Sequence, residues 1–471
     1  MAHNTLYWLR RDLRIVDNPC LAHLQSNKHS ALAIYILDDV EKNSLGKASS
    51  WWLQKSLEKL VQEYKKKFNI DLLVCEGDAL KILERYIKKY QIKEVIWNRL
   101  YSKQTIQRDS SIKKKLELEN IIVSSFNSHL LNEPWEIKNN SGEFFKVFTP
   151  YWRKSYPFFL EKNYSYQEIK KILPIKHDEK KEQFNFLPEK KWYEKFEQYW
   201  IPGEKNALQK IDQYIEQNIN HYKINRDRPD IDQTSKISPH LKFGEISPRV
   251  IVAKITKNKV TNESILTYLS EIGWREFSYT LLYYAEDLKY KPINKKFEKF
   301  NWVKNKIQFN SWKKGETGFP IVDAAMLQLY EEGWMHNRLR MIVGSFLVKN
   351  LRIHWHEGEN YFQDCLLDYD EASNPAGWQW VSGCGADAAP YFRIFNPILQ
   401  SERFDPQAKF ILKFLPQLKL LEKVKFIFQP WLNQPVLNQL IKSNKYISPI
   451  VDLSVSRNKA LDAFKEINQK I

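Results

Sequence analysis

The first 130 residues alternate between short, uninterrupted apolar runs and longer segments with helical spacing of apolar positions. The apolar runs at 6–9, 31–37, 71–75, 94–97 and 121–125 are typical of strands buried in a parallel sheet. The segments 50–67, 79–90 and 103–117 lie between them and are predicted to be helices. We therefore predict an N-terminal α/β domain over residues 1–130, with a doubly wound, Rossmann-like parallel sheet.

The pattern changes twice along the rest of the chain. Residues 131–200 are rich in Lys, Glu and aromatic side chains with scattered prolines, which predicts a long connection with short helices. Helical periodicity dominates after that, so residues 201–471 are predicted to form an all-α domain with extended loops. Its expected helices cover 204–218, 247–257, 262–285, 320–332, 334–350 and 359–367.

The composition agrees with two globular domains. A chain of 471 residues is too long for one simple core, and it is 43% hydrophobic and 27% charged. No apolar run approaches the length of a membrane span, and the N-terminus lacks the apolar core of a signal peptide. The four cysteines form no C-x-x-C pair, which argues against a zinc site or a disulfide framework. We expect a cytoplasmic protein without a metal site.

The net charge is +17, from 73 Lys and Arg against 56 Asp and Glu, and would suit a polyanionic partner such as nucleic acid. The chain is rich in Lys, Ile and Asn throughout, however, so charge alone does not decide between a nucleic-acid-binding protein and a general compositional bias. The 16 tryptophans add weight to the first interpretation, because aromatic faces stack on unpaired bases.

Ligand contacts are expected in the helical domain. The first domain has only Gly46 and Gly77 and no G-x-G-x-x-G, so a dinucleotide is not expected there in the Rossmann manner. TSKIS, at 234–238, places hydroxyl groups ahead of a predicted helix start. This arrangement suits either a phosphate or ordinary helix capping.

Two further segments combine charged, amide and aromatic side chains at helical spacing. Glu271, Trp274 and Arg275 share one helix face, which suits a flat, hydrogen-bonding ligand such as a base, or else a solvated ion pair beside a core indole. Arg340 lies on the helix expected over 334–350, and an aspartate of LLDYDEASNPAG is a ready ion-pair partner for it. That helix also carries Trp334, Asn337, Arg338 and Met341, and the loop expected after residue 367 carries Asp368, Asp370 and Asn374.

Seven segments together resemble the photolyase and cryptochrome family, most closely the bacterial class I cyclobutane pyrimidine dimer photolyases. They cover nearly the whole chain and are WLRRDLRIVDNP, KVFTPYWR, TSKIS, EIGWREF, ETGFPIVDAAM, GWMHNRLRMI and ASNPAGWQWVSGCGADAAPYFRIFNP. The resemblance implies an N-terminal α/β domain and a helical C-terminal domain that holds FAD in a folded, U-shaped conformation. It also implies ultraviolet-damaged DNA as the partner and a monomeric protein.

The resemblance assigns FAD contacts residue by residue. The phosphate and ribityl contacts would be Tyr222, Thr234, Ser235, Lys236, Ile237, Ser238, Tyr268 and Arg340. Asp368, Tyr369 and Asp370 would lie on the flavin ring side, and Asn374 would face the flavin N5. A neutral amide there suits several flavin redox states.

The implied reaction is driven by light. Excited, fully reduced flavin gives an electron to a dimer that has been flipped out of the duplex, the cyclobutane bonds split, and the electron returns. Trp274 and Trp380 would hold the dimer, and Glu271 would donate a hydrogen bond to a thymine carbonyl, which requires a protonated carboxyl group. Further DNA contacts would be Arg226, Lys242, Arg275, Asn337, Arg338, Met341 and Arg393.

Three more tryptophans, Trp378, Trp355 and Trp302, match the family's electron path from the flavin to the surface. We interpret 372–380 as an extended turn, in which Trp378 and Trp380 point to opposite sides.

The sequence does not decide the identity of a second, light-harvesting chromophore. Gln104-Thr105 and Leu288-Lys289 depart from the folate-binding pattern, so methenyltetrahydrofolate, a deazaflavin, another flavin or no antenna remain possible.

The alternatives to repair are a cryptochrome that signals without repair, a (6-4) photolyase, and a non-catalytic basic nucleic-acid-binding flavoprotein. Asn374 and the pair of Trp274 and Trp380 favour repair over a cryptochrome, including the DASH type. The helix reading MHNRLRM lacks the extra histidines of (6-4) enzymes.

Overall fold

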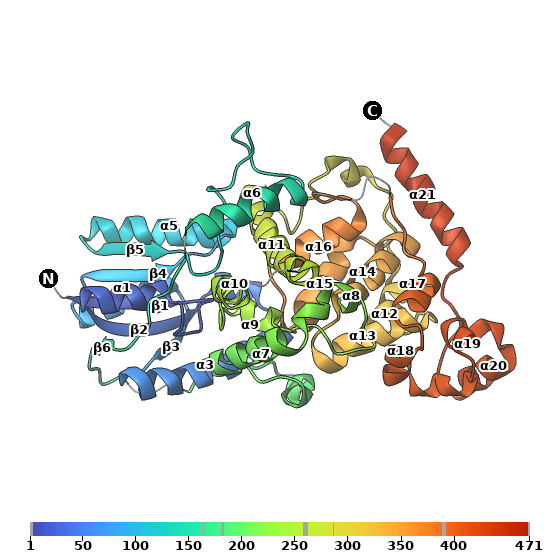
Figure 1. Ribbon diagram of the computed structural model, residues 1–471, viewed down its shortest axis with the longest axis horizontal. Helices are drawn as coiled ribbons and strands as arrows, with labels where there is room; N and C mark the ends of the chain where they lie inside the picture. Colours follow the sequence, from blue (N-terminus) through green and yellow to red (C-terminus); the bar gives the residue numbers. More distant parts are fainter. Residues whose placement is uncertain are drawn as a thin grey trace.

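The computed structural model describes residues 3–162, 164–179, 183–257, 262–285, 287–388 and 392–469. An α/β part containing the N-terminus and a helical part containing the C-terminus follow each other along the long axis of the molecule (Figure 1). The predicted fold class, a doubly wound parallel sheet followed by an all-α region, is confirmed.

A parallel sheet with strand order β3-β2-β1-β4-β5 forms the centre of the α/β part. The five predicted strands are all present, each within two residues of its expected ends. They are β1 (Asn4–Leu9), β2 (Ser30–Leu37), β3 (Leu73–Glu76), β4 (Glu94–Asn98) and β5 (Ile122–Phe126). A two-residue strand, β6 (Leu173–Pro174), pairs with the start of β2.

Helices cover both faces of this sheet because successive strand residues point to opposite sides. Tyr7 and Leu9 of β1 belong to a core shared with α1 (Pro19–Asn27) and α3 (Lys47–Phe68). Leu6 and Trp8 belong to a second core, shared with α4 (Ala79–Lys89) and α5 (Lys103–Leu118). The unbroken apolar strand sequences follow from this double coverage.

The predicted helices of the second domain are present, together with shorter helices that the periodicity did not reveal. The remaining α-helices are α2 (Asp39–Ser44), α6 (Phe148–Glu161), α7 (Glu204–Gln217), α8 (Tyr222–Asn225), α9 (Ser238–Lys242), α10 (Pro248–Thr256), α11 (Glu263–Tyr284), α12 (Lys306–Lys314), α13 (Pro320–Glu332), α14 (Asn337–Ser345), α15 (Trp355–Cys365), α16 (Ser373–Ser382), α17 (Pro397–Phe404), α18 (Lys409–Phe414), α19 (Val424–Phe428), α20 (Gln434–Lys442) and α21 (Leu453–Gln469). α14 continues through a π-helical turn, Phe346–Asn350.

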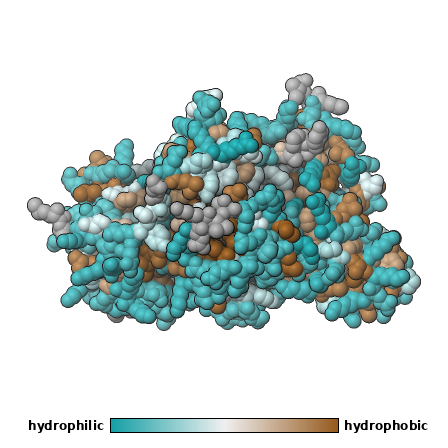
Figure 2. Space-filling view, in the orientation of Figure 1, coloured by the Kyte–Doolittle hydropathy of each residue, from teal (hydrophilic) through white to brown (hydrophobic). Residues whose placement is uncertain are grey.

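The 131–200 segment is divided between the two parts of the molecule. α6 packs against α11 of the helical part, whereas β6 extends the sheet. The boundaries 1–130, 131–200 and 201–471 therefore stay a prediction. Within the described ranges, every helix is too short or too polar to cross a membrane. Figure 2 shows a mostly hydrophilic face with small, scattered apolar areas.

The stretch at 372–380 is helical, so our interpretation of it as an extended turn was wrong. Asp370 accepts hydrogen bonds from the backbone N–H groups of Ala372 and Ser373 and so starts α16. Pro375 lies in the first turn, where a helix needs no backbone N–H group. Trp378 and Trp380 still diverge, because residues two apart on a helix lie about 200° apart around its axis.

Candidate active site

Two adjoining cavities of about 490 and 260 Å³ lie in the helical part, against α8, α9, α11, α14 and α16. Both are lined by Glu271, Arg340 and Asp368, so they form one continuous hollow. The structure brings together most of the site residues that the sequence predicted. Those lining the hollow are Tyr222, Arg226, Thr234, Ser235, Lys236, Ile237, Ser238, Lys242, Tyr268, Glu271, Trp274, Arg275, Asn337, Arg340, Met341, Asp368, Asp370, Asn374, Trp378 and Trp380.

A charged cluster lies where the two cavities meet. The Nη2 group of Arg340 donates to both carboxylate oxygens of Asp368, at 2.8 and 3.0 Å, which confirms the predicted pairing of Arg340 with an aspartate. The hydroxyl group of Ser238 donates to the same carboxylate at 2.6 Å. Asp368 is buried, and paired charges of this kind hold each other in one geometry.

The 234–238 loop forms one wall of the smaller cavity. Lys236 adopts a left-handed backbone conformation with φ of 47°, and the Tyr268 hydroxyl group donates to Ser235 Oγ at 3.1 Å. α9 begins at Ser238 and has only five residues, so its dipole is small. A phosphate at this wall would therefore depend mainly on hydroxyl groups and on the nearby cations.

Asp370 and Asn374 are fixed by buried partners. Asp370 accepts from the Tyr279 hydroxyl group at 2.6 Å; burial alone would raise the pKa of its carboxyl group, but Lys242 and Arg275 hold it below the usual range. Asn374 Nδ2 donates to Glu359 Oε1 at 3.3 Å. Glu359, on α15, was missed by the sequence analysis, because no local pattern connects it with a residue fifteen positions away.

Tyr369, a predicted FAD contact, does not line the hollow with its side chain. It is buried, and its hydroxyl group donates to the same Glu359 oxygen at 2.9 Å that accepts from Asn374. The side chain therefore supports Asn374 indirectly, through Glu359.

The donor set of the hollow fits a large, flat, anionic ligand. Lys242 lines the smaller cavity and is 2% exposed, and its buried ammonium group has no hydrogen-bond partner among the described residues. Burial lowers the pKa of Lys242 to about 8, and the charge of Arg11 acts in the same direction. An unpaired buried cation beside the Arg340 cluster and the 234–238 hydroxyl groups suits a cofactor that carries phosphates.

Lys242 is a correction to the predicted DNA contacts, whereas the role of Arg275 as a DNA contact stays a prediction. Lys242 is buried and cannot reach a DNA phosphate at the surface. Arg275 shares the expected helix face with Glu271, but its guanidinium group extends inward, where it donates to the His129 carbonyl oxygen at 2.8 Å and contacts His129 Nε2 at 2.6 Å. The spacing identified the face correctly, but it could not reveal a partner that the α/β part supplies.

The open end of the hollow carries two indoles. Trp274 stacks on Phe148 of α6, with ring centroids 3.9 Å apart and planes within 10°. Trp380 lines the same cavity from α16, and both indoles are half-buried. Phe148, which the sequence analysis did not single out, supports the back of the Trp274 ring and limits its rotation.

Glu271 lines both cavities. Its Oε1 accepts from Arg226 Nη1 at 2.5 Å, and the role of Arg226 as a DNA contact stays a prediction. Burial raises the pKa of Glu271 above its usual value, and the Arg226 charge offsets only part of that rise. Glu271 is therefore protonated to a higher pH in the pocket than it would be in water. The pocket is nevertheless less apolar than the sequence indicated, because it also contains the Arg226 charge.

Arg338 and Arg393 lie outside the hollow. Arg338 is paired with Asp227 at 2.7 Å, and its guanidinium carbon lies 4.4 Å from the Phe404 ring centroid. Arg393 is exposed; its carbonyl oxygen accepts from Lys349, and its guanidinium carbon lies 5.2 Å from the Phe395 ring centroid. Both stay predictions as DNA contacts.

The three tryptophans of the predicted electron path run from the interior toward the surface. Trp378 and Trp355 are 4% and 1% exposed, whereas Trp302 is only half-buried. The His354 ring lies between the last two, 5.5 Å from Trp355 and 4.9 Å from Trp302. Aromatic rings thus connect Trp355 with half-buried Trp302, and the step from Trp378 to Trp355 stays a prediction.

A Gly358→Ala substitution is expected to lower the free energy of unfolding by about 1–3 kcal/mol. A Cβ atom at Gly358 would lie 2.2 Å from the Trp378 ring and 2.6 Å from Leu347, so the indole would have to move. Gly377→Ala is the matched control, because a Cβ atom there meets nothing within 4 Å. Thermal unfolding of both variants measures the difference. Equal melting temperatures would contradict this close packing.

The segments that departed from the folate pattern share another cavity. This separate cavity of about 400 Å³ is lined by Gln104, Leu288 and Lys289, together with Tyr369 and Glu371. Thr105 is buried, and its hydroxyl group donates a hydrogen bond to the Ser102 carbonyl oxygen. The identity of any antenna chromophore stays open.

Comparison with known proteins gives full-length matches. A family described as the FAD binding domain of DNA photolyase matches residues 268–466, and one described as DNA photolyase matches residues 5–166. The chain is 38% identical to a deoxyribodipyrimidine photo-lyase of Agrobacterium fabrum, over 98% of each chain. It is also 32% identical to cryptochrome-2 of Arabidopsis thaliana, covering 99% of this chain and 80% of that protein.

Solved structures agree with these matches. A bacterial class III photolyase from Agrobacterium tumefaciens has a TM-score of 0.92 and 37% identity, covering 100% of this chain and 98% of that one. A cryptochrome from Synechocystis has a TM-score of 0.86 and 27% identity, covering 98% and 99%. The expected likeness to class I enzymes in particular finds no support in these matches.

Proposed function

Because the chain belongs to the DNA photolyase family and binds FAD, we propose that it is a deoxyribodipyrimidine photo-lyase that uses light to split cyclobutane pyrimidine dimers in DNA. The observation that carries this proposal is the open end of the hollow. Two indoles and a carboxyl group with a raised pKa line its entrance side, and the Asn374 amide lines the same cavity. A flipped-out pair of bases offers flat faces and carbonyl oxygens that match such groups.

The subclass that we propose follows the relatives. The solved structure described as a class III photolyase resembles this chain at 37% identity over essentially its whole length. We therefore propose class III in place of the class I likeness drawn from the motifs. Monomeric state and cytoplasmic location stay predictions.

The cofactor end of the hollow is proposed to bind and orient FAD. Reduced FAD, when bound, supplies the light-driven electron for dimer splitting. Arg340, held by Asp368, which Ser238 also contacts, offers a fixed positive charge, and Lys242 offers a buried one. The amide of Asn374 is held by Glu359, which limits its rotation and keeps an uncharged group at this position.

The open end is proposed to bind the dimer. Trp274, supported by Phe148, and Trp380, from α16, would contact the two faces or edges of the flipped bases and exclude water from them. Glu271 would hold a proton and donate it in a hydrogen bond to a thymine carbonyl oxygen. Arg226, in contact with Glu271, would then lie close enough to the DNA backbone to add positive charge.

Dimer splitting is expected to decline as the pH rises through the raised pKa of Glu271. The protonated, donating carboxyl group is present below that pKa and is lost above it, because burial favours the neutral form. Glu271→Gln keeps a permanent N–H donor and should flatten the decline. Below that pKa, Glu271→Ala should lower the repair quantum yield by about two- to tenfold, the worth of one hydrogen bond, and above it the variant should differ little from wild type.

Quantum yields of wild type, Glu271→Gln and Glu271→Ala, measured over the pH range in which all three remain folded, check this prediction. If the alanine variant had the wild-type quantum yield below that pKa, Glu271 would have no part in the reaction.

Electrophoretic binding to intact and ultraviolet-irradiated DNA, first in the dark and then under blue light, tests the proposed function. We expect preferential binding to irradiated DNA in the dark, and light-dependent release with loss of dimers. Stable binding without release would leave a cryptochrome-like receptor or a non-catalytic DNA-binding flavoprotein, the two alternatives to repair.

A further inference from the structure

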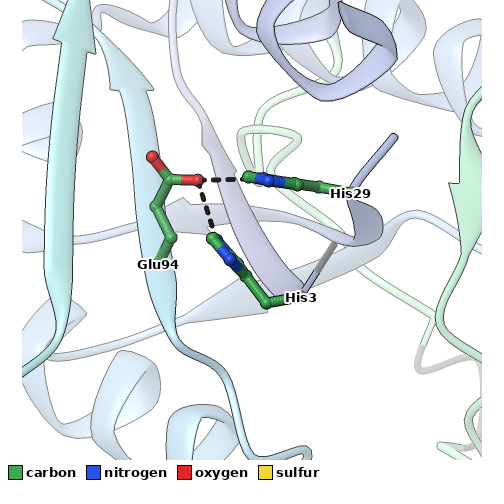
Figure 3. A group of neighbouring side chains, drawn as sticks. All are labelled: His3, His29 and Glu94. Carbon is green, nitrogen blue, oxygen red and sulfur yellow. Dashed lines mark hydrogen bonds and ion pairs between the residues drawn. The ribbon is translucent and has the colours of Figure 1, made fainter. Parts of the chain in front are cut away.

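We propose that His3, His29 and Glu94 form a binding site for a divalent transition-metal ion, with Zn²⁺ as the ion that fits best, at the edge of the sheet where its strands begin (Figure 3). The site is independent of the proposed DNA repair. The N-terminus lies at the end of the molecule farthest from the helical part (Figure 1).

The topology of the sheet brings the three residues together. His3 and His29 immediately precede β1 and β2, and Glu94 is the first residue of β4. These strands are neighbours in the order β2-β1-β4 and all run parallel, so their first residues meet at one edge. The Ser30 N–H group donates to the His3 carbonyl oxygen at 3.1 Å, which anchors the backbone of His3 beside β2.

The donor atoms have the spacing of metal ligands. Glu94 Oε2 lies 3.3 Å from His3 Nε2 and 3.2 Å from His29 Nδ1. One ligand atom from each residue lies within 4.8 Å of the others. Ligands of a tetrahedral zinc ion, with bonds of about 2.0–2.1 Å, are separated by about 3.3 Å. The site therefore needs little rearrangement to accept the ion.

The surroundings of Glu94 also favour a cation. Five groups contact its two oxygens, whereas a carboxylate offers about four lone-pair positions. They are His3 Nε2, His23 Nε2, His29 Nδ1, Thr5 Oγ1 and Ser124 Oγ. A metal ion bound by His3, His29 and Glu94 Oε2 would replace two of these contacts, those of His3 and His29 with Oε2, with coordination bonds.

His23 and Ser124 would then orient the carboxylate. They contact the other oxygen, Oε1, at 3.0 and 2.9 Å, and carboxylate ligands of metal ions are regularly held by such outer hydrogen bonds. The side chain of Glu94 is 3% exposed, and that of His3 is 25% exposed. An ion can therefore enter from the His3 side, where water can complete the coordination.

Two imidazole nitrogens and one carboxylate oxygen form a ligand set that suits Zn²⁺ and disfavours Mg²⁺, which prefers oxygen ligands. An ion at this position would join the first described residue of the chain to two other strands. Its expected effect is thus on the stability of the α/β part and on the order of the N-terminus.

The test measures the metal content of tag-free, flavin-containing protein. The protein is equilibrated with Zn²⁺ or Mg²⁺ and dialysed, and the metal that it retains is measured by elemental mass spectrometry. We expect one Zn²⁺ and no Mg²⁺ per wild-type chain, and a higher melting temperature with Zn²⁺. His3→Ala should lower the Zn²⁺ affinity by at least about tenfold and remove the thermal effect. Because His3 is at the edge and partly exposed, the variant should fold and keep its flavin spectrum.

His221→Ala provides the matched control, since His221 is exposed in the helical part and should leave zinc binding unchanged. Glu94→Gln is the second variant and should also lose the zinc. The proposal is overturned if wild type retains no zinc, or if His3→Ala and Glu94→Gln retain as much zinc as wild type. In that case the cluster is a network of hydrogen bonds only.

Discussion

A Trp380→Ala variant is expected to bind dimer-containing DNA about 10- to 100-fold more weakly than wild type, while its affinity for undamaged DNA stays the same. Stacking of a base on an aromatic side chain is worth about 1–3 kcal/mol, and each 1.4 kcal/mol is about tenfold in affinity. Trp380 is half-buried and lines the open end of the hollow, so its indole is available to a ligand. Binding titrations in the dark, with irradiated and intact duplexes, measure both affinities.

Trp135→Ala is the matched control for this prediction. Trp135 is 41% exposed and does not line the hollow, so its loss should leave both affinities unchanged. If Trp380→Ala weakened binding to intact and irradiated DNA equally, Trp380 would be a general DNA contact and the proposed dimer pocket would be wrong.

A Trp378→Phe variant is expected to lose nearly all photoreduction of oxidised flavin but to retain repair when the flavin is reduced chemically beforehand. Phenylalanine fills most of the space of the indole but is far harder to oxidise. Trp378 is buried against Gly358 and lines the larger cavity, and it begins the predicted path that continues through Trp355 to half-buried Trp302. Absorption spectra recorded during blue illumination measure the photoreduction rate.

Two further variants complete this experiment. Trp302→Phe should give the same loss as Trp378→Phe, because both belong to one path. Trp431→Phe should not, since Trp431 packs against Phe319 away from the cavity. Full photoreduction in Trp302→Phe, with loss only in Trp378→Phe, would mean that electrons leave Trp378 by another route. Trp312, whose ring centroid lies 6.3 Å from that of Trp378, would be the candidate.

The strands could be predicted from the sequence because their residues are buried on both faces, which makes the apolar runs continuous and unambiguous. α16 could not be predicted in the same way. Its Asn, Pro and Gly residues favour a turn locally, but capping by Asp370 and packing of Trp378 override that preference. Local propensity fails here because the segment is part of a binding site as well as of the core.

Helical spacing likewise predicted which side chains share a face, but not their partners. Glu271, Trp274 and Arg275 do share a side of α11, yet Arg226, Phe148 and His129 decide what each one does. These partners come from distant segments, so no local pattern could reveal them. For the same reason, the sequence did not reveal that Glu359 contacts Asn374, or that a cluster of side chains surrounds Glu94.

The central claim is most directly tested by illuminating an oligonucleotide that contains a single thymine dimer with the protein in its reduced state, and counting the remaining dimers by chromatography. We predict that blue light restores two thymines for each dimer lost, over many turnovers for each protein molecule, and that no dimer is lost in the dark. An unchanged number of dimers after illumination, with the protein still bound to the damaged strand, would contradict repair.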